Sequence, residues 1–400
     1  MKLYCEKRTY NLKQGNYDVI FDFNTKDDIV KLKELFEIEN EINNNFLLEL
    51  TSINFENYKE ITENQWYDIP IKFFEKFKVS TINSAKEEIN NSIFLSLIQK
   101  NKNPITLKKY KIGFLQYNYP EYNSDKNLTS DEFKKYITLK NNKPYTNFSS
   151  SYLNVYNVGC GNCNEIITSS IRIFFDLGVD IKYNKQHINS IIKSINFNQP
   201  YNCVLSHWDF DHYKLILELK DKYLINMNTF LAPSKIPNTL SVNKCFDVLK
   251  RLKIPYLIID KTTRLNKRIN LSKKYDIFNN IELYRSSDGS NLNQSGIVLV
   301  YKGKNKHTIL TGDHHYYQIY DYIISPNSNQ LKYEIVVPHH GGNAGTLNES
   351  LWNNLRLTGC ISTKSGRYQN LPHKNNHDYF YNQKKFHCTE CKNAHYKTKI

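Results

Sequence analysis

The first 145 residues are polar, and the periodic apolar pattern that they contain is helical. Within "KDDIVKLKELFEIENEINNNFLLEL", apolar side chains recur at the spacing that gathers them on one face of a helix: Ile29, Leu32, Leu35 and Phe36. The chain up to residue 150 then becomes rich in Asn, Ser, Pro and Lys, which is typical of an irregular connection. We therefore predict an N-terminal region at residues 1–148 that contains helix and has mixed α/β character.

From residue 149 onward the pattern changes to short apolar runs that end in glycine-rich turns or polar clusters. Runs of this length, bounded by turn residues, predict buried strands. We expect strands in "YLNVYNVG", "IRIFFDLG", "YNCVLSH", "YLINMNTFLAP", "IPYLIID", "GIVLVYKG", "HTILTGD", "YEIVVPHH" and "TGCISTKS". Helical stretches between several of them indicate an α/β or layered α+β protein.

The strand-rich pattern fills a large domain at residues 149–385, followed by a Cys- and His-containing tail at residues 386–400. A chain of 400 residues with 40% hydrophobic content can bury at least one large core. No run approaches the roughly 18 apolar residues that span a bilayer, and "MKLYCEKRTY" lacks the apolar core of a secretion signal. We expect a cytoplasmic protein without a membrane partner.

The net charge of +15 is unevenly distributed along the chain. Lys predominates among the basic residues, beside many Asn, Ile and Tyr, a composition that an AT-rich genome produces without selection for a partner. Residues 1–150, however, carry 22 Lys and Arg against 21 Asp and Glu, which leaves 32 against 18 for residues 151–400. A net charge of +14 on the strand-rich part favours a polyanionic substrate or partner there.

The motif "SHWDFDH" follows the third predicted strand and contains four side chains of metal-binding type: His207, Asp209, Asp211 and His212. In a tight turn beyond a strand end, side chains can converge on one point. Imidazole and carboxylate together suit Zn²⁺, Mn²⁺ or Fe, and four such groups exceed what one tetrahedral site takes from so short a stretch. The motif favours two adjacent metals, and the alternative is a polar turn held by caps and ion pairs.

Two further clusters of the same residue types follow later strands. "HTILTGDHH" supplies Asp313, and "EIVVPHHGG" supplies His339 and His340, followed by glycines that permit a close backbone approach. Either cluster alone is weak support for a site. Three strand-end clusters of metal-ligand types in one chain strengthen the prediction of a metal centre.

The order of these motifs resembles the metallo-β-lactamase fold, and in particular the metallo-β-lactamase domain of ComEC-type DNA-uptake proteins. "NVGCGNC" resembles the turn after the first strand of that branch, "FFDLG" its strand ending in Asp-x-Gly, and "CISTKSGRYQNLPH" its closing segment. The resemblance covers roughly residues 150–380. It implies an α+β protein with a four-layer αβ/βα sandwich, preceded by the helix-containing N-terminal region, with metals at one edge of the β layers.

The resemblance also implies which residues hold the metals. One metal would be bound by His207 and Asp209, the other by Asp211, His212 and His340, with Asp313 bridging them. The cofactors would be two divalent ions, Zn²⁺ or Mn²⁺, and the alternative is a single ion, because few ligands serve the first position. Further candidate ligands are His339, Asn293 and His373.

The implied chemistry is hydrolysis. Two divalent cations lower the pKa of a bound water, which supplies the nucleophile, and they neutralise the charge that develops on an oxyanion. Asp211, His212 and Asp313 would be the catalytic residues, because Asp211 can orient or accept the proton. Lys364 and Arg367 are candidates to hold a phosphate, and the alternative is solvated surface charge.

Two Cys-x-x-Cys pairs stand apart from this constellation. Cys160 and Cys163 could join Cys388 and Cys391 in a structural zinc site if both pairs meet in space. The alternative is that all of them are free, reduced thiols, as is usual in a cytosolic protein.

These observations favour a metal-dependent phosphodiesterase, more narrowly a nuclease, acting on nucleic acid. One alternative is a hydrolase of small esters, lactones, thioesters or cyclic nucleotides, which uses the same metal apparatus. A second, of another class, is a non-catalytic binding protein whose metal site is partly decayed. In each case residues 1–148 are a candidate surface for a protein partner.

Overall fold

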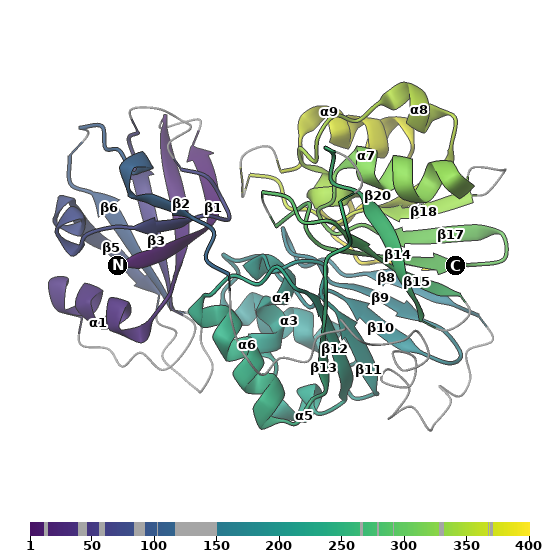
Figure 1. The fold of residues 1–400 in the computed structure, drawn as a ribbon, viewed down its shortest axis with the longest axis horizontal. Coiled ribbons are helices and arrows are strands. Elements are labelled where there is room, and N and C mark those ends of the chain that lie inside the picture. Colours follow the sequence, from purple (N-terminus) through teal and green to yellow (C-terminus); the bar gives the residue numbers. More distant parts are fainter. Residues whose placement is uncertain are drawn as a thin grey trace. The chain divides into compact units, whose positions relative to one another are not determined.

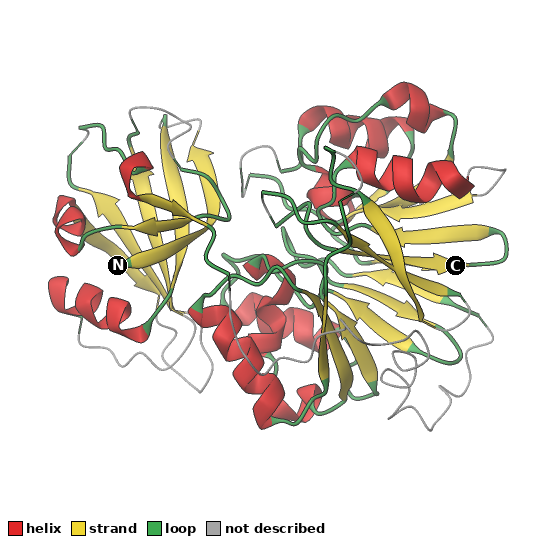
Figure 2. Cartoon of the chain, viewed as in Figure 1, coloured by secondary structure: helices red, strands yellow, loops and turns green. Residues whose placement is uncertain are grey.

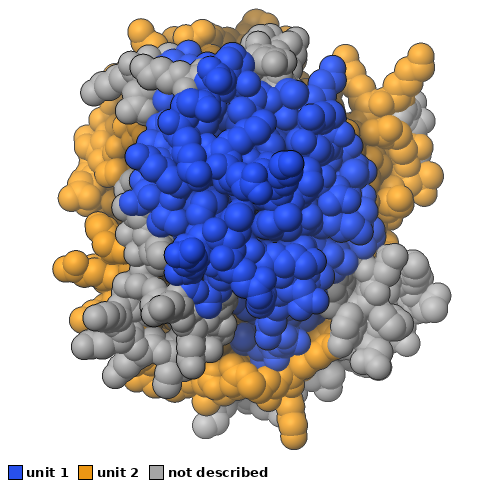
Figure 3. Space-filling model, turned by 90° about the vertical axis from the view of Figure 1, so that its left-hand side faces the viewer, with its two compact units in different colours: residues 1–118, 236–248, 367–369 blue, residues 119–235, 249–366, 370–400 orange. Residues whose placement is uncertain are grey.

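The computed structural model describes most of the chain in two compact units. Described are residues 1–11, 15–38, 46–55, 61–83, 93–101, 103–116, 150–264, 267–277, 280–290, 292–327, 332–366, 368 and 371–400. The first unit comprises residues 1–118, 236–248 and 367–369, and the second comprises residues 119–235, 249–366 and 370–400 (Figure 3). The predicted domain boundary at residue 148 falls outside the described residues and stays a prediction.

The first unit is built on a mixed seven-stranded sheet in the order β5-β6-β3-β2-β1-β4-β7 (Figure 1). Its strands are β1 (Lys2–Asn11), β2 (Asn16–Phe23), β3 (Phe46–Ile53), β4 (Trp66–Asp68), β5 (Phe77–Asn83), β6 (Ile93–Gln99) and β7 (Lys111–Gly113). β3 and β6 are parallel, whereas the other neighbours are antiparallel. The sequence pattern predicted mixed α/β character for this region but located none of these strands.

The predicted helix in the first unit is α1 (Lys26–Leu35). Thr25 caps its first turn, because its side-chain oxygen accepts a hydrogen bond from the Asp28 N–H. Ile29 and Leu32 of α1 are buried in the apolar core of this unit, and Leu35 and Phe36 pack against that core. The helical spacing therefore identified the face of α1 that contacts the sheet.

The second unit contains two seven-stranded sheets. The first has the order β13-β12-β11-β10-β9-β8-β21, and its strands are β8 (Tyr152–Val155), β9 (Asn164–Ile167), β10 (Arg172–Phe175), β11 (Tyr201–Val204), β12 (Met227–Pro233), β13 (Tyr256–Ile259) and β21 (Tyr396–Lys399). The second has the order β14-β15-β16-β17-β18-β19-β20, and its strands are β14 (Leu271–Ile277), β15 (Ile281–Ser286), β16 (Ile297–Lys302), β17 (Lys306–Leu310), β18 (Lys332–Val336), β19 (Arg356–Ile361) and β20 (His387–Cys388).

The two sheets pack face to face around one apolar core. Ile173, Val204 and Leu231 of the first sheet share that core with Leu299 and Leu310 of the second. Each strand therefore buries alternate side chains between the sheets and presents the others to the outer layers.

Helices form the two outer layers of the sandwich (Figures 1 and 2). α3 (Lys185–Ser194), α4 (Phe210–Glu218) and α5 (Asp221–Leu224) accompany the parallel strands β10 to β13. α6 (Leu240–Arg251) follows β12 in the chain, and its residues 240–248 belong to the first unit. α7 (Tyr316–Ile319), α8 (Glu349–Asn353) and the turns after α9 (Lys374–His377) cover the outer face of the second sheet. In the described residues no helix is long and apolar enough to cross a membrane.

The predicted fold class, an α+β sandwich of four layers after a helix-containing region, is confirmed by this arrangement. All nine stretches predicted as strands contain one. Residues 386–400, which the sequence pattern set apart as a tail, instead supply an edge strand to each sheet, because β20 pairs with β19 and β21 pairs with β8. α10 (Thr389–Lys392) connects these two edges.

Candidate metal centre

Three strand ends meet at one edge of the sandwich. β11 of the first sheet ends at Val204, just before the "SHWDFDH" motif, and its last residues pair in parallel with β10 and β12. β17 and β18 are parallel neighbours in the second sheet and end just before the "TGD" and "PHHGG" motifs. Because parallel neighbours present the same end at the same edge, the pairing of β17 with β18 brings the second and third motifs together. The first motif, on the other sheet, lies beside them, since Asp313 is close to His207 and His212.

Asp313 lies among three histidines at this edge. Its Oδ2 is 3.8 Å from His207 Nε2, and its Oδ1 is 3.5 Å from His212 Nε2 and 3.9 Å from His340 Nε2. All four side chains are at most 3% exposed. One carboxylate thus faces the three imidazoles with both of its oxygens, which is the position predicted for a bridging ligand.

Two overlapping groups of ligand atoms result, and His212 belongs to both. One comprises His207, His212 and Asp313, and the other comprises Asp211, His212 and His340, with the ligand atoms of each group within 4.8 Å of one another. The second group is the set predicted for the second metal. Asp209, predicted beside His207, places its Oδ2 at 3.4 Å from His207 Nε2.

The donor atoms fit divalent metal ions. His207 Nε2, His212 Nε2 and His340 Nε2 are buried and make no hydrogen bond to the described part of the chain, although burying such atoms is costly. Two ligand atoms on one tetrahedral Zn²⁺ lie roughly 3.4 Å apart, and separations of 3.4 to 3.9 Å leave room for a cation among them. Imidazole nitrogen and carboxylate oxygen are also the ligand types of Zn²⁺ and Mn²⁺.

The other nitrogen of each ring is held by the fold. His212 Nδ1 lies 2.8 Å from Asp176 Oδ2, His207 Nδ1 lies 3.0 Å from Ser206 Oγ, and His340 Nδ1 lies 3.0 Å from the Ser362 carbonyl oxygen. A hydrogen bond at Nδ1 turns Nε2 toward the centre and fixes which nitrogen is free to bind a metal.

Asp176 is a positioning residue that the sequence pattern did not single out. Its carboxylate accepts hydrogen bonds from the Ser206 N–H at 2.6 Å and from Asn162 Nδ2 at 2.8 Å, in addition to its contact with His212. It follows β10 directly and is completely buried. The sequence signal was present in "FFDLG", where an apolar strand ends in a carboxylate.

The carboxylates set the charge of the centre. Burial alone would lower the pKa of His212, but Asp313 and Asp176 outweigh burial and raise it to about 10. Burial likewise opposes ionisation of Asp313, yet His339 and His212 hold the pKa of that carboxyl well below its usual range. The neighbouring carboxylates therefore favour a positive charge at this position.

The backbone at the centre is tightly packed. His339 and His340 have φ angles of 51° and 54°, in the left-handed region that side-chain-bearing residues rarely adopt. Gly178 lies so close to the Asp211 carbonyl that an added Cβ would overlap it. These positions bring side chains from separate elements to one point, and backbone strain is expected where such sites are built.

The structure separates the remaining candidate ligands from the two groups of three. His339 Nδ1 contacts Asp313 Oδ2, and Asn293 Nδ2 lies 3.3 Å from the same His339 nitrogen. The His373 N–H donates to the Gly341 carbonyl at 2.9 Å, but its ring belongs to neither group. His339 and Asn293 therefore line the centre around Asp313.

The candidate phosphate-binding residues are only partly described. Lys364 is 41% exposed at its side chain, and its Nζ lies 3.9 Å from Glu390 Oε1. Arg367 lies outside the described residues. Phosphate binding by either residue stays a prediction.

His314 is a further buried histidine beside the centre that the sequence pattern did not single out. Its Nδ1 lies 2.9 Å from the Thr311 carbonyl oxygen, and burial lowers its pKa to about 3. Gly296 leaves room for the ring, since a Cβ there would lie 3.1 Å from His314 Cε1. The signal for it was the "HH" that directly follows Asp313 in "TGDHH".

The predicted zinc site of four cysteines is corrected by the structure. Cys160 Sγ lies 2.9 Å from the Lys364 carbonyl oxygen, and Cys163 is buried near Glu165 and Asp176, so neither joins a ligand group among the described residues. Cys388 and Cys391 instead lie beside His377. The two Cys-x-x-Cys pairs stand on different turns of the sandwich and do not converge.

Three imidazoles and three carboxylates meet at the strand ends of an αββα sandwich. The protein therefore belongs to the class of proteins with a candidate dinuclear metal centre. Among solved structures, the chain is similar to metallo-β-lactamase superfamily proteins. Tm1679, described as a metal-dependent hydrolase of the beta-lactamase superfamily, has 11% identity and a TM-score of 0.34, with 60% of this chain and 94% of that chain covered.

Two other structures show similarly low scores. The metallo-beta-lactamase fold protein YhfI from Bacillus subtilis has 11% identity and a TM-score of 0.35, covering 62% of this chain and all of that chain. A mutant of CmlA beta-hydroxylase has 8% identity and a TM-score of 0.38, and the match spans 64% of this chain but 54% of that chain. No protein-family model and no curated protein matches the sequence.

Proposed function

We propose that the protein is a metal-dependent hydrolase, and that its substrate is a phosphodiester of nucleic acid. One observation carries the proposal: three buried imidazole nitrogens without hydrogen bonds in the described chain face the two oxygens of one buried carboxylate. A purely structural polar cluster would pair these atoms with donors, because an unsatisfied buried polar atom destabilises the fold.

When bound, divalent cations at this centre supply Lewis acidity and a nucleophilic water at neutral pH. His207, His212 and His340 would hold them through Nε2, together with Asp209, Asp211 and the bridging Asp313. Asp176 keeps the His212 ring oriented through its Nδ1. Asp211 is the candidate to accept or orient a proton, since it lies in the centre at 3.9 Å from His340 Nε2.

The preference for nucleic acid rests on charge and on the motifs. Residues 151–400, which include every residue of the centre, carry the net charge of +14. A basic surface attracts a phosphate backbone without reading its sequence. The likeness of the motifs to the ComEC-type branch supports the same substrate class. A partner-binding role for residues 1–148 and a cytoplasmic location stay predictions.

The test is cleavage by protein reconstituted with Mn²⁺ or Zn²⁺. Single-stranded and double-stranded DNA, RNA, a cyclic dinucleotide and a lactone are offered in parallel. We expect the nucleic acids to be cut, and we expect Asp211→Asn and His212→Gln to lose activity by at least about 100-fold, since each removes a ligand of the centre. His187→Gln, which changes a histidine of α3 away from these ligand groups, is the control and should keep wild-type activity.

Three outcomes would overturn all or part of the proposal. Turnover of the lactone or the cyclic dinucleotide, without cleavage of the polymers, would keep the hydrolase but replace its substrate class. Metal binding without turnover of any substrate would favour the non-catalytic alternative. Equal cleavage by wild type and both centre variants would show that the activity comes from elsewhere.

A further inference from the structure

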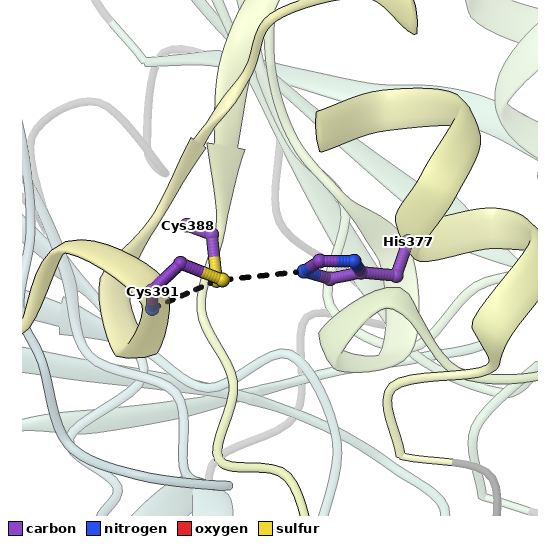
Figure 4. A group of neighbouring side chains, drawn as sticks. All are labelled: His377, Cys388 and Cys391. Carbon is purple, nitrogen blue, oxygen red and sulfur yellow. Dashed lines mark hydrogen bonds between the residues drawn. The ribbon is translucent and has the colours of Figure 1, made fainter. Parts of the chain in front are cut away.

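A second cluster of metal-ligand types lies near the C-terminus, and its residues come from three short elements (Figure 4). His377 is the last residue of α9, Cys388 is the last residue of β20, and Cys391 lies in α10. Their potential ligand atoms all lie within 4.8 Å of one another. The figure shows the imidazole and the two thiols pointing toward one another.

We propose that His377, Cys388 and Cys391 bind one structural zinc ion, with the fourth position open to a water molecule. This site is separate from the candidate hydrolytic centre and shares no residue with it. It has the Cys-x-x-Cys spacing of many zinc sites, and a histidine that precedes the first cysteine by eleven positions completes the set of three.

The geometry matches zinc coordination. Cys391 Sγ lies 3.4 Å from His377 Nε2. With Zn–S at about 2.3 Å and Zn–N at about 2.0–2.1 Å, a tetrahedral ion would hold these two atoms about 3.6 Å apart. The site needs only a small adjustment of the side chains to accept the ion.

The backbone orients the sulfur of Cys388. The Cys391 N–H donates a hydrogen bond to Cys388 Sγ at 3.2 Å, which closes the turn of the Cys-x-x-Cys segment. Such a bond orients a sulfur ligand in the way that outer contacts orient a histidine. Cys388 is buried, whereas Cys391 is exposed, so the ion would lie at the surface with one side open to solvent.

The other histidines of this segment have different partners. His387 Nε2 lies 3.2 Å from the Ala394 carbonyl oxygen, and His395 Nδ1 lies 2.8 Å from the Asn157 backbone nitrogen. Neither belongs to the group of three. His377, which the sequence pattern did not connect with the cysteines, is therefore the nitrogen ligand.

The ion would hold a segment that supports both sheets. β20 is only two residues long, and α10 carries the chain from it toward β21 in the other sheet. Thr389 Oγ1 accepts a hydrogen bond from the Thr363 N–H at 3.1 Å, and Glu390 Oε2 accepts one from the Ser365 N–H at 2.6 Å. A cross-link from α9 to this turn would stabilise an edge that short strands alone hold weakly.

Cobalt substitution of the reduced full-length protein tests the proposal. Cobalt bound to thiolate sulfur gives a near-ultraviolet charge-transfer band, whereas the candidate hydrolytic centre offers only nitrogen and oxygen. We expect this band in the wild type and in Asp211→Asn. We expect Cys391→Ser to abolish it and His377→Gln to weaken cobalt binding by at least about tenfold. Cys391 is exposed, so its substitution should leave the fold intact.

Two matched controls make the result specific. His387→Gln removes a neighbouring histidine outside the cluster, and Cys160→Ser removes a thiol of the other pair, so both should retain the band. Zinc analysis should show one equivalent less in Cys391→Ser than in the wild type. Chelation should lower the melting temperature of Asp211→Asn by more than that of Asp211→Asn combined with Cys391→Ser.

The proposal fails if the reduced wild type gives no thiolate band, or if Cys391→Ser retains it at full strength. A Cys388–Cys391 disulfide in the protein as isolated, with no cobalt band after reduction, would replace the zinc site by a redox pair. None of these outcomes depends on hydrolytic activity, so they leave the proposed function untouched.

Discussion

The orientation of His212 shows how one residue links the fold to the centre. Its Nε2 faces Asp313, and its Nδ1 is held by Asp176, which in turn is fixed by hydrogen bonds from Ser206 and Asn162. Because Asp176 is not itself one of the candidate ligands, its effect on metal binding would pass through the imidazole. Removing its charge should weaken metal binding without removing a ligand.

We predict that Asp176→Asn lowers metal affinity by about 10-fold to 100-fold, the range expected for the partner of a ligating histidine. Titration of the metal-free protein with Zn²⁺ measures the change directly. Asp276→Asn is the matched control, because that carboxylate is 49% exposed at its side chain and pairs with Lys273 instead. An affinity equal to that of the control would remove Asp176 from the positioning network.

Close backbone packing makes a second prediction at this scale. Gly178→Ala should destabilise the protein by about 1–3 kcal/mol or more, because the new methyl group would overlap the Asp211 carbonyl and force the backbone apart. Gly289→Ala should cost less, since its Cβ would meet the flexible end of Ile269. Urea denaturation of both variants compares them, and equal losses would contradict the packing argument.

Residue types in the sequence indicated the ligands, but their partners depended on the fold. "SHWDFDH", "TGD" and "PHHGG" contain every residue of the two ligand groups. Sequence could not show that Cys160 turns to the Lys364 carbonyl, or that His377 lies beside Cys391, because tertiary packing determines both contacts. The four-cysteine prediction was wrong for that reason.

At the scale of elements, strands with continuous apolar runs were predictable and polar ones were not. β11 and β18 have four buried residues in succession, a pattern that a buried parallel strand requires. β14 mixes buried positions with half-buried and exposed ones and contains two lysines, and β20 has only two residues. β21 at the C-terminus has only half-buried and exposed positions, so the sequence pattern did not predict it as an edge strand.

The attachment of β21 gives the prediction at this scale. Tyr396 donates a hydrogen bond to Glu334 Oε1 at 2.7 Å, and Glu334 is buried in β18 of the other sheet. Tyr396→Phe should cost about 1.5–3 kcal/mol because the acceptor is charged. Tyr301→Phe, which loses a bond of 2.8 Å to the neutral Ser151 Oγ, should cost about 0.5–1.5 kcal/mol. Urea unfolding curves of both variants measure the two losses of stability. A larger loss for Tyr301→Phe than for Tyr396→Phe would contradict this account.

At the scale of the whole molecule, the position of the candidate centre and the distribution of net charge are the basis for the proposed substrate. The sandwich places every ligand of the candidate centre at one edge, and the same part of the chain carries nearly all of the basic excess. The sequence alone shows this distribution of charge. The strands of the seven-stranded sheet of the first unit could not be located in the same way, because they are polar or short and lack a strong pattern. A surface that binds phosphates through charge should respond to salt.

We predict that binding of single-stranded DNA or RNA weakens steeply with salt, with a slope of log K against log salt of about −0.7 for each phosphate neutralised. Catalytically inactive Asp211→Asn protein permits the measurement by fluorescence anisotropy. If Lys364 contacts a phosphate, Lys364→Ala reduces the magnitude of this slope by about 0.7.

Lys193→Ala provides the comparison, because it removes an equal charge from an exposed position at the end of α3. If only general attraction to a basic surface holds the nucleic acid, the loss of one charge lowers affinity by a similar small factor in both variants. Both slopes then stay nearly unchanged. A specific contact changes the slope of Lys364→Ala alone. Binding that is insensitive to salt in every variant would instead argue for a small, uncharged substrate at the centre, because binding that releases no counterions does not depend on salt.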